Sequence, residues 1–282
     1  MATERKPKEV TRSFPFLQVN QRDGKPRKRG LTEIRGPYYS VVGRRYLEDL
    51  FEMMSAYVDS LKFAGGSFTL MPESTVREII DLCHKRDVLV STGGFIERVL
   101  VQGGDAVRRY VAECKKLGFD IIEISAGFVS IPTDDWLRLI DLVRKSGLKA
   151  KPEVGIQFGA GGATAAAELR AEGTRDPNWA IAQAKRFLEA GAEIIMIESE
   201  GITENVDPWQ TDVPAKFINE LGIEKLMFEA ADPDVFAWYI KNYGAAVNLF
   251  VDHSQIVQLE SRRAGIWGTK SLWGRVVTYK EE

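Results

Sequence analysis

The sequence predicts a single-domain α/β protein with the (β/α)8 TIM-barrel architecture. A pattern recurs in which a helical segment ends near a glycine and a short apolar strand follows. Eight such strands alternate with eight amphipathic helical segments, an order typical of a parallel sheet covered by helices. The length of 282 residues suits eight units closed into a barrel, for which ~250 residues is usual. An open, doubly wound sheet is the alternative, and the absence of a Gly-x-Gly-x-x-Gly motif after the first strand disfavours it.

Each predicted strand is a short apolar run, and most of these runs follow a glycine. The sequence AGAEIIMIESE at residues 190–200 shows the pattern, with two carboxylates directly after the apolar run. Glycine suits a helix end because it adopts the left-handed conformation without a Cβ clash. The eight strands are predicted within residues 30–36, 57–66, 87–94, 117–125, 146–155, 190–200, 221–230 and 243–252.

The predicted helices carry their apolar residues on one face. In the first, that face is formed by Leu47, Leu50, Phe51 and Met54. Ser74 and Ser254 are expected to be N-caps, because a serine hydroxyl accepts a bond from a free N–H group of the first turn. The eight helices are predicted at residues 44–57, 74–86, 105–117, 133–145, 177–190, 213–221, 233–243 and 254–264.

Composition and charge narrow the class of protein. Hydrophobic residues make up 44% of the chain and charged residues 28%, as in ordinary soluble domains. A formal net charge of −2 argues against a protein that binds nucleic acid or membrane surfaces through charge. No apolar run approaches the ~20 residues that cross a bilayer, and no signal-peptide core is present near the amino terminus. We therefore expect a cytoplasmic protein with no membrane part and no nucleic-acid partner.

Three regions are predicted along the chain. Residues 1–25 are polar and unpatterned, which indicates a flexible tail. Residues 26–265 form the barrel. Residues 266–282 form a carboxyl-terminal tail with two tryptophans, Trp267 and Trp273, which we expect to pack on the barrel or on a neighbouring subunit.

Ionisable residues stand near the end of seven of the eight strands. In a (β/α)8 barrel the active site lies at the carboxyl-terminal mouth, and residues two apart on a strand share a face. The pattern therefore predicts a polar ring at the mouth, although structural ion pairs lining the barrel would produce the same pattern. The same-face sets are Glu33 with Arg35, Ser60 with Lys62, Glu123 with Ser125, Lys149 with Lys151 and Glu153, Glu198 with Glu200, Glu229 alone, and Asn248 with Asp252.

Such a ring suits small, anionic ligands. The basic residues could hold a phosphate or carboxylate, and clustered glutamates could hold Mg²⁺. No Ser or Cys nucleophile motif and no His-Glu-x-x-His motif is present, which disfavours hydrolase and zinc sites. An aldolase with a Schiff base on Lys62, Lys149 or Lys151 is a weaker alternative, and it needs a buried lysine with a lowered pKa.

Three loops at the mouth each allow two interpretations. Gly93 and Gly94 could cradle an anion or simply form a tight turn. His253, just after the eighth strand, could contact a ligand or cap its loop. Residues 158–176 form the longest loop region, which could be a lid or an insertion without a role.

The ordered motifs at the strand ends resemble those of the phosphosulfolactate synthase family, from about Pro26 to the carboxyl terminus. The motifs are VDSLKFAGGS, STGGFIE, LGFDIIEISAG, KPEVG, AGAEIIMIE and GTKSLWGRV. Two more, TEIRGPYYS and VDHSQI, resemble the plant heat-stress-associated branch most closely.

The resemblance implies a Mg²⁺-dependent lyase-type reaction in which sulfite adds to phosphoenolpyruvate, and a homo-oligomer. Carried onto this chain, it implies catalytic roles for Lys62, Glu123, Lys151 and Glu153. Together with the pattern of polar residues at the strand ends, it predicts substrate binding by Arg35, Lys62, Gly93, Gly94, Ser125, Asn248 and His253. It implies metal binding by Glu153, Glu198 and Glu229.

The chain departs from the family pattern at several mouth positions. Arg35 begins the segment that replaces Asp-Lys-Gly, Ala126 replaces an aspartate, and Ile156 and Gln157 replace lysines. A related reaction on another phosphorylated or carboxylated substrate is therefore an alternative. A second alternative is a non-catalytic, heat-stress-associated barrel that acts through protein partners.

Overall fold

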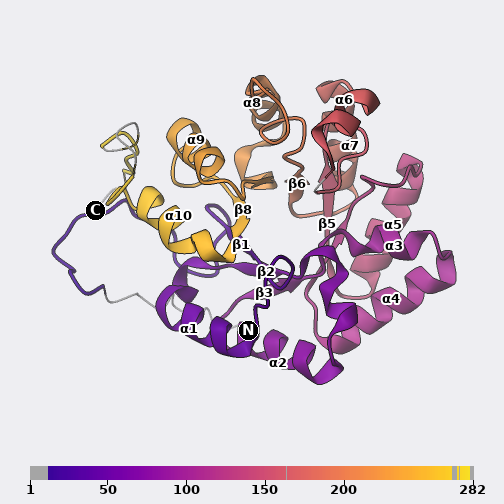
Figure 1. Cartoon of the computed structure of the whole chain (residues 1–282), viewed down its shortest axis with the longest axis horizontal. Helices are drawn as coiled ribbons and strands as arrows, with labels where there is room; N and C mark the ends of the chain where they lie inside the picture. Colours follow the sequence, from indigo (N-terminus) through magenta and orange to yellow (C-terminus); the bar gives the residue numbers. More distant parts are fainter. Residues whose placement is uncertain (1–11, 163, 269–271, 273, 280–282) are drawn as a thin grey trace.

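The computed structural model describes residues 12–162, 164–268, 272 and 274–279. Within them, eight parallel strands form a closed barrel in chain order, and the last strand pairs with the first. The helices surround the strands (Figure 1). The predicted (β/α)8 barrel is confirmed.

The strands are shorter than the predicted segments, because the flanking residues form turns at both ends. Their bounds are β1 (Thr32–Arg35), β2 (Ser60–Lys62), β3 (Leu89–Ser91), β4 (Ile121–Ile124), β5 (Lys149–Val154), β6 (Ile195–Ile197), β7 (Leu226–Glu229) and β8 (Leu249–Asp252). The register sets Arg35 beside Lys62 and Lys62 beside Ser91, so inward side chains of neighbouring strands lie at similar heights.

The eight predicted helices are present, and two short helices join them. The predicted set corresponds to α1 (Arg44–Met54), α2 (Glu73–His84), α4 (Gly104–Leu117), α5 (Thr133–Lys145), α7 (Pro177–Glu189), α8 (Asp212–Leu221), α9 (Pro233–Tyr243) and α10 (Ile256–Arg263). The additional helices are α3 (Ile96–Leu100) and α6 (Ala166–Glu172). Short 3₁₀ turns lie at η1 (Ser55–Tyr57), η2 (Ala64–Leu70), η3 (Gly93–Phe95), η4 (Ile223–Lys225) and η5 (His253–Gln255).

Both predicted serine N-caps are wrong. Ser74 lies inside α2, whose N-cap is Pro72. After β8 the cap is Asp252, whose carboxylate accepts a bond from the Ser254 N–H group while the Gln255 side chain completes a capping box. A carboxylate placed directly at the strand end takes the role predicted for the serine two residues later.

Most of the apolar core lies between the barrel and its helices. Phe51, Phe187 and Phe236 from three helices are fully buried there against the outward faces of the strands. Inside the barrel the apolar cluster is small, with Met196, Met227 and Phe250 at its centre. The interior toward the mouth is consequently left to polar side chains.

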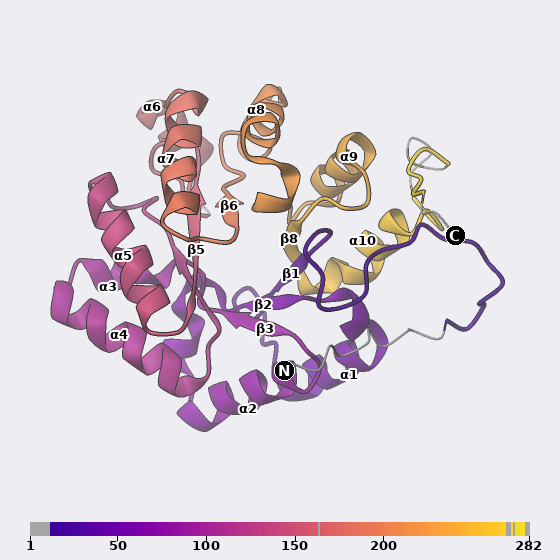
Figure 2. The same ribbon diagram turned by 180° about the vertical axis from the view of Figure 1, so that it is seen from behind.

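Residues near the two ends of the described chain lie side by side next to α10 (Figures 1 and 2). The backbone N–H of Asn20 donates to Ala264 at 2.9 Å, and its side-chain amide donates to the carbonyl of Val276 at 2.5 Å. Leu272 and Val276 are buried in the main core. Contacts with the barrel therefore begin at Asn20, before the predicted boundary at residue 26.

Trp267 and Trp273 are the two tryptophans predicted to pack on the barrel or on a neighbouring subunit. Trp267 is 69% exposed, and Trp273 lies outside the described residues, as do residues 1–11 of the predicted amino-terminal tail.

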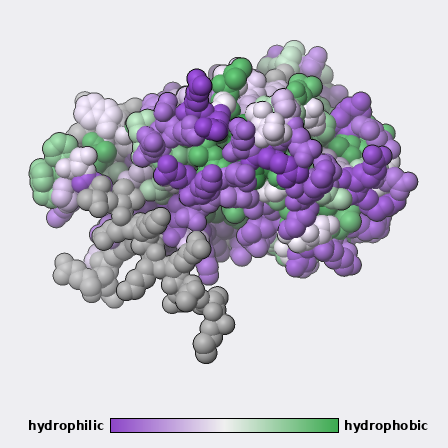
Figure 3. Space-filling model, turned by 90° about the horizontal axis from the view of Figure 1, so that it is seen from below, coloured by the Kyte–Doolittle hydropathy of each residue, from purple (hydrophilic) through white to green (hydrophobic). Residues whose placement is uncertain are grey.

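The outer face over α1 and α2 is mainly hydrophilic, with only small groups of hydrophobic atoms (Figure 3). No helix in the described ranges combines the length and the apolar character that crossing a membrane requires. The thiols of Cys83 and Cys114 are free and buried, and burial raises the pKa of each to about 12. They pack as small apolar groups.

Candidate active site

Two lysines and three glutamates form a continuous network of charges inside the barrel. The Lys62 ammonium on β2 lies 2.8 Å from a carboxylate oxygen of Glu123 on β4 and 3.2 Å from one of Glu229 on β7. The Lys151 ammonium on β5 lies 3.0 Å from the same Glu123 oxygen and 2.5 Å from Glu33 on β1. Closure of the barrel thus brings charges from five strands into one cluster.

Burial makes each of these charges depend on its partners. The side chains of Lys62, Glu123 and Lys151 are 4%, 2% and 6% exposed. Burial alone would raise the pKa of Glu123, but Lys62 and Lys151 hold it below its ordinary 4.5, so this carboxylate stays ionised. Removing one partner of a buried ion pair commonly costs about 3–5 kcal/mol, because the other charge is left uncompensated.

Lys62 keeps its proton. Burial alone would lower the pKa of this ammonium group, but the carboxylates around it, chiefly Glu123 and Glu229, raise the pKa above its usual 10.5. The ammonium also lies 4.0 Å from the centre of the Phe250 ring, a favourable cation–π contact. A Schiff-base lysine needs a lowered pKa, so Lys62 does not support the aldolase alternative.

Lys149 lies at the opposite end of β5 from the mouth. It begins the strand, its side chain is 48% exposed, and its ammonium pairs with Glu193 at 2.7 Å. It shares a face of β5 with Lys151 but does not join the buried network. Lys149 stands at the amino-terminal rim of the barrel, whereas Lys151 lies further along the strand, in the interior.

Glu153 on β5 and Glu198 after β6 form no salt bridge within the described chain. Burial raises the pKa of both carboxyls well above 4.5, and negative neighbours raise it further, namely Glu123 for Glu153 and Glu229 for Glu198. One oxygen of Glu198 accepts bonds from the next two backbone N–H groups, at 2.7 and 3.0 Å. The mouth therefore contains carboxyl groups that have no lysine partner among the described residues.

The metal ligands implied by the family resemblance are Glu153, Glu198 and Glu229. Among the residues that the structure describes, no group of three His, Cys, Asp or Glu side chains is arranged to hold a metal ion. Mg²⁺ usually binds proteins through one or two carboxylates together with substrate oxygens and water. Glu198 and Glu229, whose negative charges repel each other, fit that smaller set of oxygen donors.

A small cavity of about 40 Å³ opens beside these carboxyls, at the ends of β4 and β5. Its lining includes Ala126, Glu153, Gln157, Arg175 and Glu198. A Cβ atom on Gly155 would lie 2.9 Å from the Cβ of Glu198. Glycine at this position therefore allows the Glu198 side chain to pack directly against the backbone that follows β5.

Gly93 and Gly94 allow two chain segments to approach closely. A Cβ atom on Gly93, whose φ is +62°, would lie 2.8 Å from the Phe63 carbonyl oxygen, and one on Gly94 would lie 2.4 Å from the Ser125 hydroxyl. Ser125 donates to the carboxylate of Glu97. These contacts account for both glycines by packing, and they direct the Ser125 hydroxyl to Glu97.

Glu97 organises the loop after β4. Besides Ser125, its two oxygens accept bonds from the backbone N–H groups of Gly127 at 3.1 Å and Phe128 at 2.7 Å. Its partners lie some thirty residues away along the chain, and the local sequence pattern does not identify them.

Arg35 and His253 lie on the β1 and β8 side of the mouth. The Arg35 guanidinium is 3.6 Å from Asp252 and stacks on the Tyr39 ring at 4.8 Å. His253 contacts the Tyr46 hydroxyl at 2.7 Å and the Ser40 hydroxyl at 3.3 Å through its two ring nitrogens. Burial lowers the pKa of His253, and its two ring nitrogens join the segment after β8 to α1 and to the loop after β1.

Asn248 lies at the amino-terminal end of β8, opposite the mouth. Its carbonyl oxygen accepts a bond from the Leu31 N–H at 2.8 Å, and its amide donates to the Leu226 carbonyl at 2.8 Å. It is fully buried. The structure therefore gives it a part in joining β1 to β7 and β8, and it does not lie with the other residues predicted to bind substrate.

Residues 158–176 form a folded segment over the β4–β6 side of the mouth. Glu200 accepts bonds from the N–H groups of Gly161 at 3.0 Å and Thr164 at 3.2 Å. The Gln157 amide donates to the carbonyls of Leu169 at 2.6 Å and Gly173 at 2.8 Å. The departure at Gln157 thus has a structural use, which sequence alone does not reveal.

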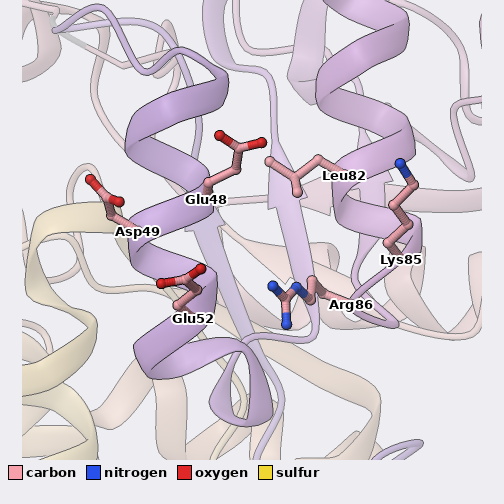
Figure 4. Close-up of a pocket in the computed structure, with 6 residues that line it drawn as sticks. All are labelled: Glu48, Asp49, Glu52, Leu82, Lys85 and Arg86. Carbon is pink, nitrogen blue, oxygen red and sulfur yellow. The ribbon is translucent and has the colours of Figure 1, made fainter.

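A larger hollow of about 510 Å³ lies on the outside of the barrel between α1 and α2 (Figure 4). It is lined by Glu48, Asp49 and Glu52 from α1 and by Leu82, Lys85 and Arg86 from the end of α2. These charges stand on outer helical faces, where water solvates them. The buried and mutually dependent charges at the mouth are the stronger candidate for chemistry.

Similar proteins are known for nearly the whole chain. The profile of the family described as (2R)-phospho-3-sulfolactate synthase (ComA) matches residues 20–269. The chain is 43% identical over 258 residues to the protein HEAT-STRESS-ASSOCIATED 32 of Arabidopsis thaliana, covering 88% of this chain and 90% of that one. It is 28% identical over 263 residues to the phosphosulfolactate synthase of Methanothermobacter thermautotrophicus, covering 91% and 96%.

Solved structures with similar folds are much more distant in sequence. The carboxyl transferase domain of Rhizobium etli pyruvate carboxylase with pyruvate matches at a TM-score of 0.55 and 14% identity, over 89% of this chain and 45% of that chain. N-acetylneuraminate lyase of Mycoplasma synoviae matches at 0.50 and 11%, over 84% and 72%. At such identities the likeness concerns the fold alone.

Proposed function

Because the chain belongs to the (2R)-phospho-3-sulfolactate synthase (ComA) family, we propose that it is a lyase-type synthase acting at the barrel mouth. The proposed reaction adds sulfite, or a related nucleophile, to phosphoenolpyruvate or a similar small phosphorylated carboxylate. The observation that carries the proposal is the protonated, buried Lys62 ammonium amid the carboxylates of the mouth.

The product name of the family fixes the bonds that change. The sulfur lone pair of sulfite forms a bond to the methylene carbon, C3, and the electrons of the double bond move onto C2 and the carboxylate. A proton then adds to C2, which keeps its phosphoryl group. The protein must therefore hold two anions together, stabilise the enolate charge and supply one proton.

The residues of the mouth suit these tasks. Lys62 supplies a fixed positive charge for the carboxylate of the substrate, where negative charge grows during the reaction. Lys151 and Glu123 hold the Lys62 side chain in place through the buried network. Glu153, whose raised pKa favours its protonated form, is the proposed proton donor to C2.

Magnesium would be held by Glu198 and Glu229 together with oxygens of the substrate. When bound there, Mg²⁺ would supply a positive charge that offsets the charge developing on the enolate. Arg35, paired with Asp252, would stand at the opposite side of the opening and attract the anionic substrate. The chain departs from the family pattern at Ala126, Ile156 and Gln157. These departures are the reason to keep a related phosphorylated or carboxylated substrate as the alternative to phosphoenolpyruvate.

Phosphorus NMR of the pure protein with phosphoenolpyruvate, sulfite and Mg²⁺ tests the proposal. We expect the substrate signal to be replaced by that of a phosphorylated, saturated product. Lys62→Ala and Glu198→Ala should lose this conversion, because the first removes the positive charge offered to the substrate and the second removes an oxygen ligand proposed for Mg²⁺. Lys149→Ala is the matched control, since Lys149 belongs to the same lysine ladder but lies at the opposite rim. Equal conversion by Lys62→Ala and the wild type would contradict the assignment.

A partner-binding barrel without catalysis is the second candidate, and one observation favours it. The loops on the mouth side expose several large apolar side chains, among them Tyr39 at 67%, Val41 at 96%, Leu70 at 90% and Phe128 at 65%. Exposed apolar residues gathered on one face are typical of interaction surfaces. This candidate predicts that the wild-type protein leaves phosphoenolpyruvate unchanged in the same NMR experiment.

A further inference from the structure

Arg175 is a partly buried cation whose guanidinium pairs with no carboxylate in the described part of the chain. Its central carbon lies 4.4 Å from the centre of the Phe158 ring and 4.7 Å from that of the Trp179 ring. Its Nε atom is buried and has no hydrogen-bond partner. Burial lowers the pKa of Arg175, and no neighbouring carboxylate offsets this effect.

The backbone around Arg175 is fixed on both sides. Its N–H donates to the Ile156 carbonyl at 2.7 Å, and the segment before it pairs antiparallel to the end of β5 through Gln157 and Thr174. Directly after it, Asp176 caps α7 by accepting a bond from the Asn178 N–H at 2.9 Å. The two rings and these two attachments give the guanidinium a defined position instead of a free surface one.

Arg175 lines the small cavity at the mouth together with Glu153 and Glu198. Of the residues that line this cavity, Arg175 is the one with a positive charge. A cavity needs roughly 10–15 Å³ of such volume for each water molecule, so about 40 Å³ holds about three water-sized atoms. The three oxygens of sulfite match that space most closely, and sulfate and phosphate each carry one oxygen more.

The other cations at the mouth each have a carboxylate partner. Lys62, Lys151 and Arg35 each have a carboxylate within 3.6 Å. Arg175 therefore stands apart among the described mouth residues as a cation free to take an anion. A guanidinium donates parallel N–H bonds that match two oxygens of an oxyanion, and an anion would restore the interaction energy that burial removes.

We propose that Arg175 binds a small oxyanion of the sulfite, sulfate or phosphate type in this cavity. The inference rests on the proposed function for its place in catalysis, because it assigns to Arg175 one of the two oxyanions of that reaction, either sulfite or the phosphoryl group of the substrate. The rings of Phe158 and Trp179 hold the guanidinium in place.

Calorimetric titration with sulfite, sulfate and phosphate tests the inference without any turnover. We expect the wild-type protein to bind at least one of these anions and Arg175→Gln to bind it at least about tenfold more weakly. Arg175→Lys should bind with intermediate affinity, since it keeps the charge and loses the planar donor pair. Arg170→Gln is the matched control, because Arg170 lies five residues away on α6 and is exposed. Tightest binding of sulfite would assign the site to the nucleophile, and tightest binding of phosphate would assign it to the phosphoryl group.

A second measurement needs no variant and covers the case in which Arg175→Gln fails to fold. Phenylglyoxal labels accessible arginines, and mass spectrometry reads the labelled position. Sulfate or phosphate, which unlike sulfite do not add to the aldehyde group of the reagent, should protect Arg175 from labelling and leave Arg170 unprotected. Equal labelling of Arg175 with and without the anions, or equal anion affinity of the wild type and Arg175→Gln, would overturn the inference. Arginine-dependent binding without turnover would instead contradict the proposed reaction alone.

Discussion

Lys62 and Lys151 neutralise some carboxylates of the barrel interior and leave others without a counter-charge. Glu123 lies between the two ammonium groups and is held ionised. Glu153 and Glu198 have no such partner, and burial raises the pKa of each. These buried glutamates therefore differ in the direction of their pKa shifts because of their neighbours, which is how one site can offer both a charge and a proton.

Glu198→Gln should change how stability depends on pH. The folded-state pKa of Glu198 is raised above the ordinary 4.5, so the unfolded chain releases this proton first as pH rises. The stability that Glu198 contributes is fully present below about pH 4.5 and is lost as pH rises through the folded-state pKa, by up to about 1.4 kcal/mol for each unit of pH. Glutamine imitates the protonated carboxyl and escapes this loss.

Urea unfolding at several pH values measures this effect. Glu198→Gln should be more stable than the wild type at pH 8, and the difference should shrink toward pH 4.5. Glu189→Gln, on the exposed face of α7, is the control and should show no such trend. A constant difference between Glu198→Gln and the wild type across the range would show that Glu198 is not held protonated by its surroundings.

The position of a single side chain at the mouth was predictable from sequence only where the alternation of a strand determines which way it faces. Lys62, Glu123 and Lys151 occupy inward positions near strand ends, and the period of two residues identifies such positions. Asn248 follows the same alternation but lies at the other end of its strand, and the pattern alone does not fix the height in the barrel. Arg175 was missed because its contacts are Ile156 and Phe158, which follow β5, and Trp179 on α7, and strand alternation does not identify them.

The segment between residues 158 and 176 covers one side of the mouth and is attached to the barrel. α6 packs through Leu169, which is 2% exposed, and the segment is attached to the barrel by the Glu200 carboxylate and the Gln157 amide. This folded segment covers one side of the mouth and places Arg175 at the small cavity. Of the two predicted interpretations, an ordered cover fits these contacts better than a loose insertion.

Glu200→Ala should loosen this segment while the barrel stays folded. The change leaves the N–H groups of Gly161 and Thr164 without their acceptor, which costs on the order of 1–3 kcal/mol for each buried donor. Hydrogen exchange of the amides in α6 should become faster, and exchange in β4 and β5 should stay slow. Glu168→Ala, on an exposed position of α6, should exchange like the wild type. Unchanged protection of α6 in Glu200→Ala would contradict the proposed attachment.

Element order was predictable because two periods, one of strands and one of helices, alternate eight times. Element ends were less predictable. α3 and α6 are short, and their sequences fall inside regions where glycine-rich turns dominate the pattern. The caps at Ser74 and Ser254 failed because Pro72 and Asp252, two residues earlier, already end the preceding turn and strand.

At the scale of the whole molecule, the buried charge network forms because the barrel closes. Closure brings Glu33 from β1, Glu123 from β4 and Glu229 from β7 around the same two lysines. The predicted family, inferred from motifs at successive strand ends, is confirmed by the profile match over residues 20–269. The joined ends of the chain were not predictable, because the bonds of Asn20 and Gln21 to the carboxyl-terminal segment span some 250 residues.

The central claim is that the mouth of the barrel holds a small phosphorylated anion. A crystal structure of the protein grown with Mg²⁺ and phosphoenolpyruvate tests it most directly. The account predicts electron density for the ligand at the carboxyl ends of the strands, with its carboxylate or phosphate in contact with the Lys62 ammonium. Density confined to the outer hollow between α1 and α2, or a mouth that stays empty at saturating ligand, would contradict it.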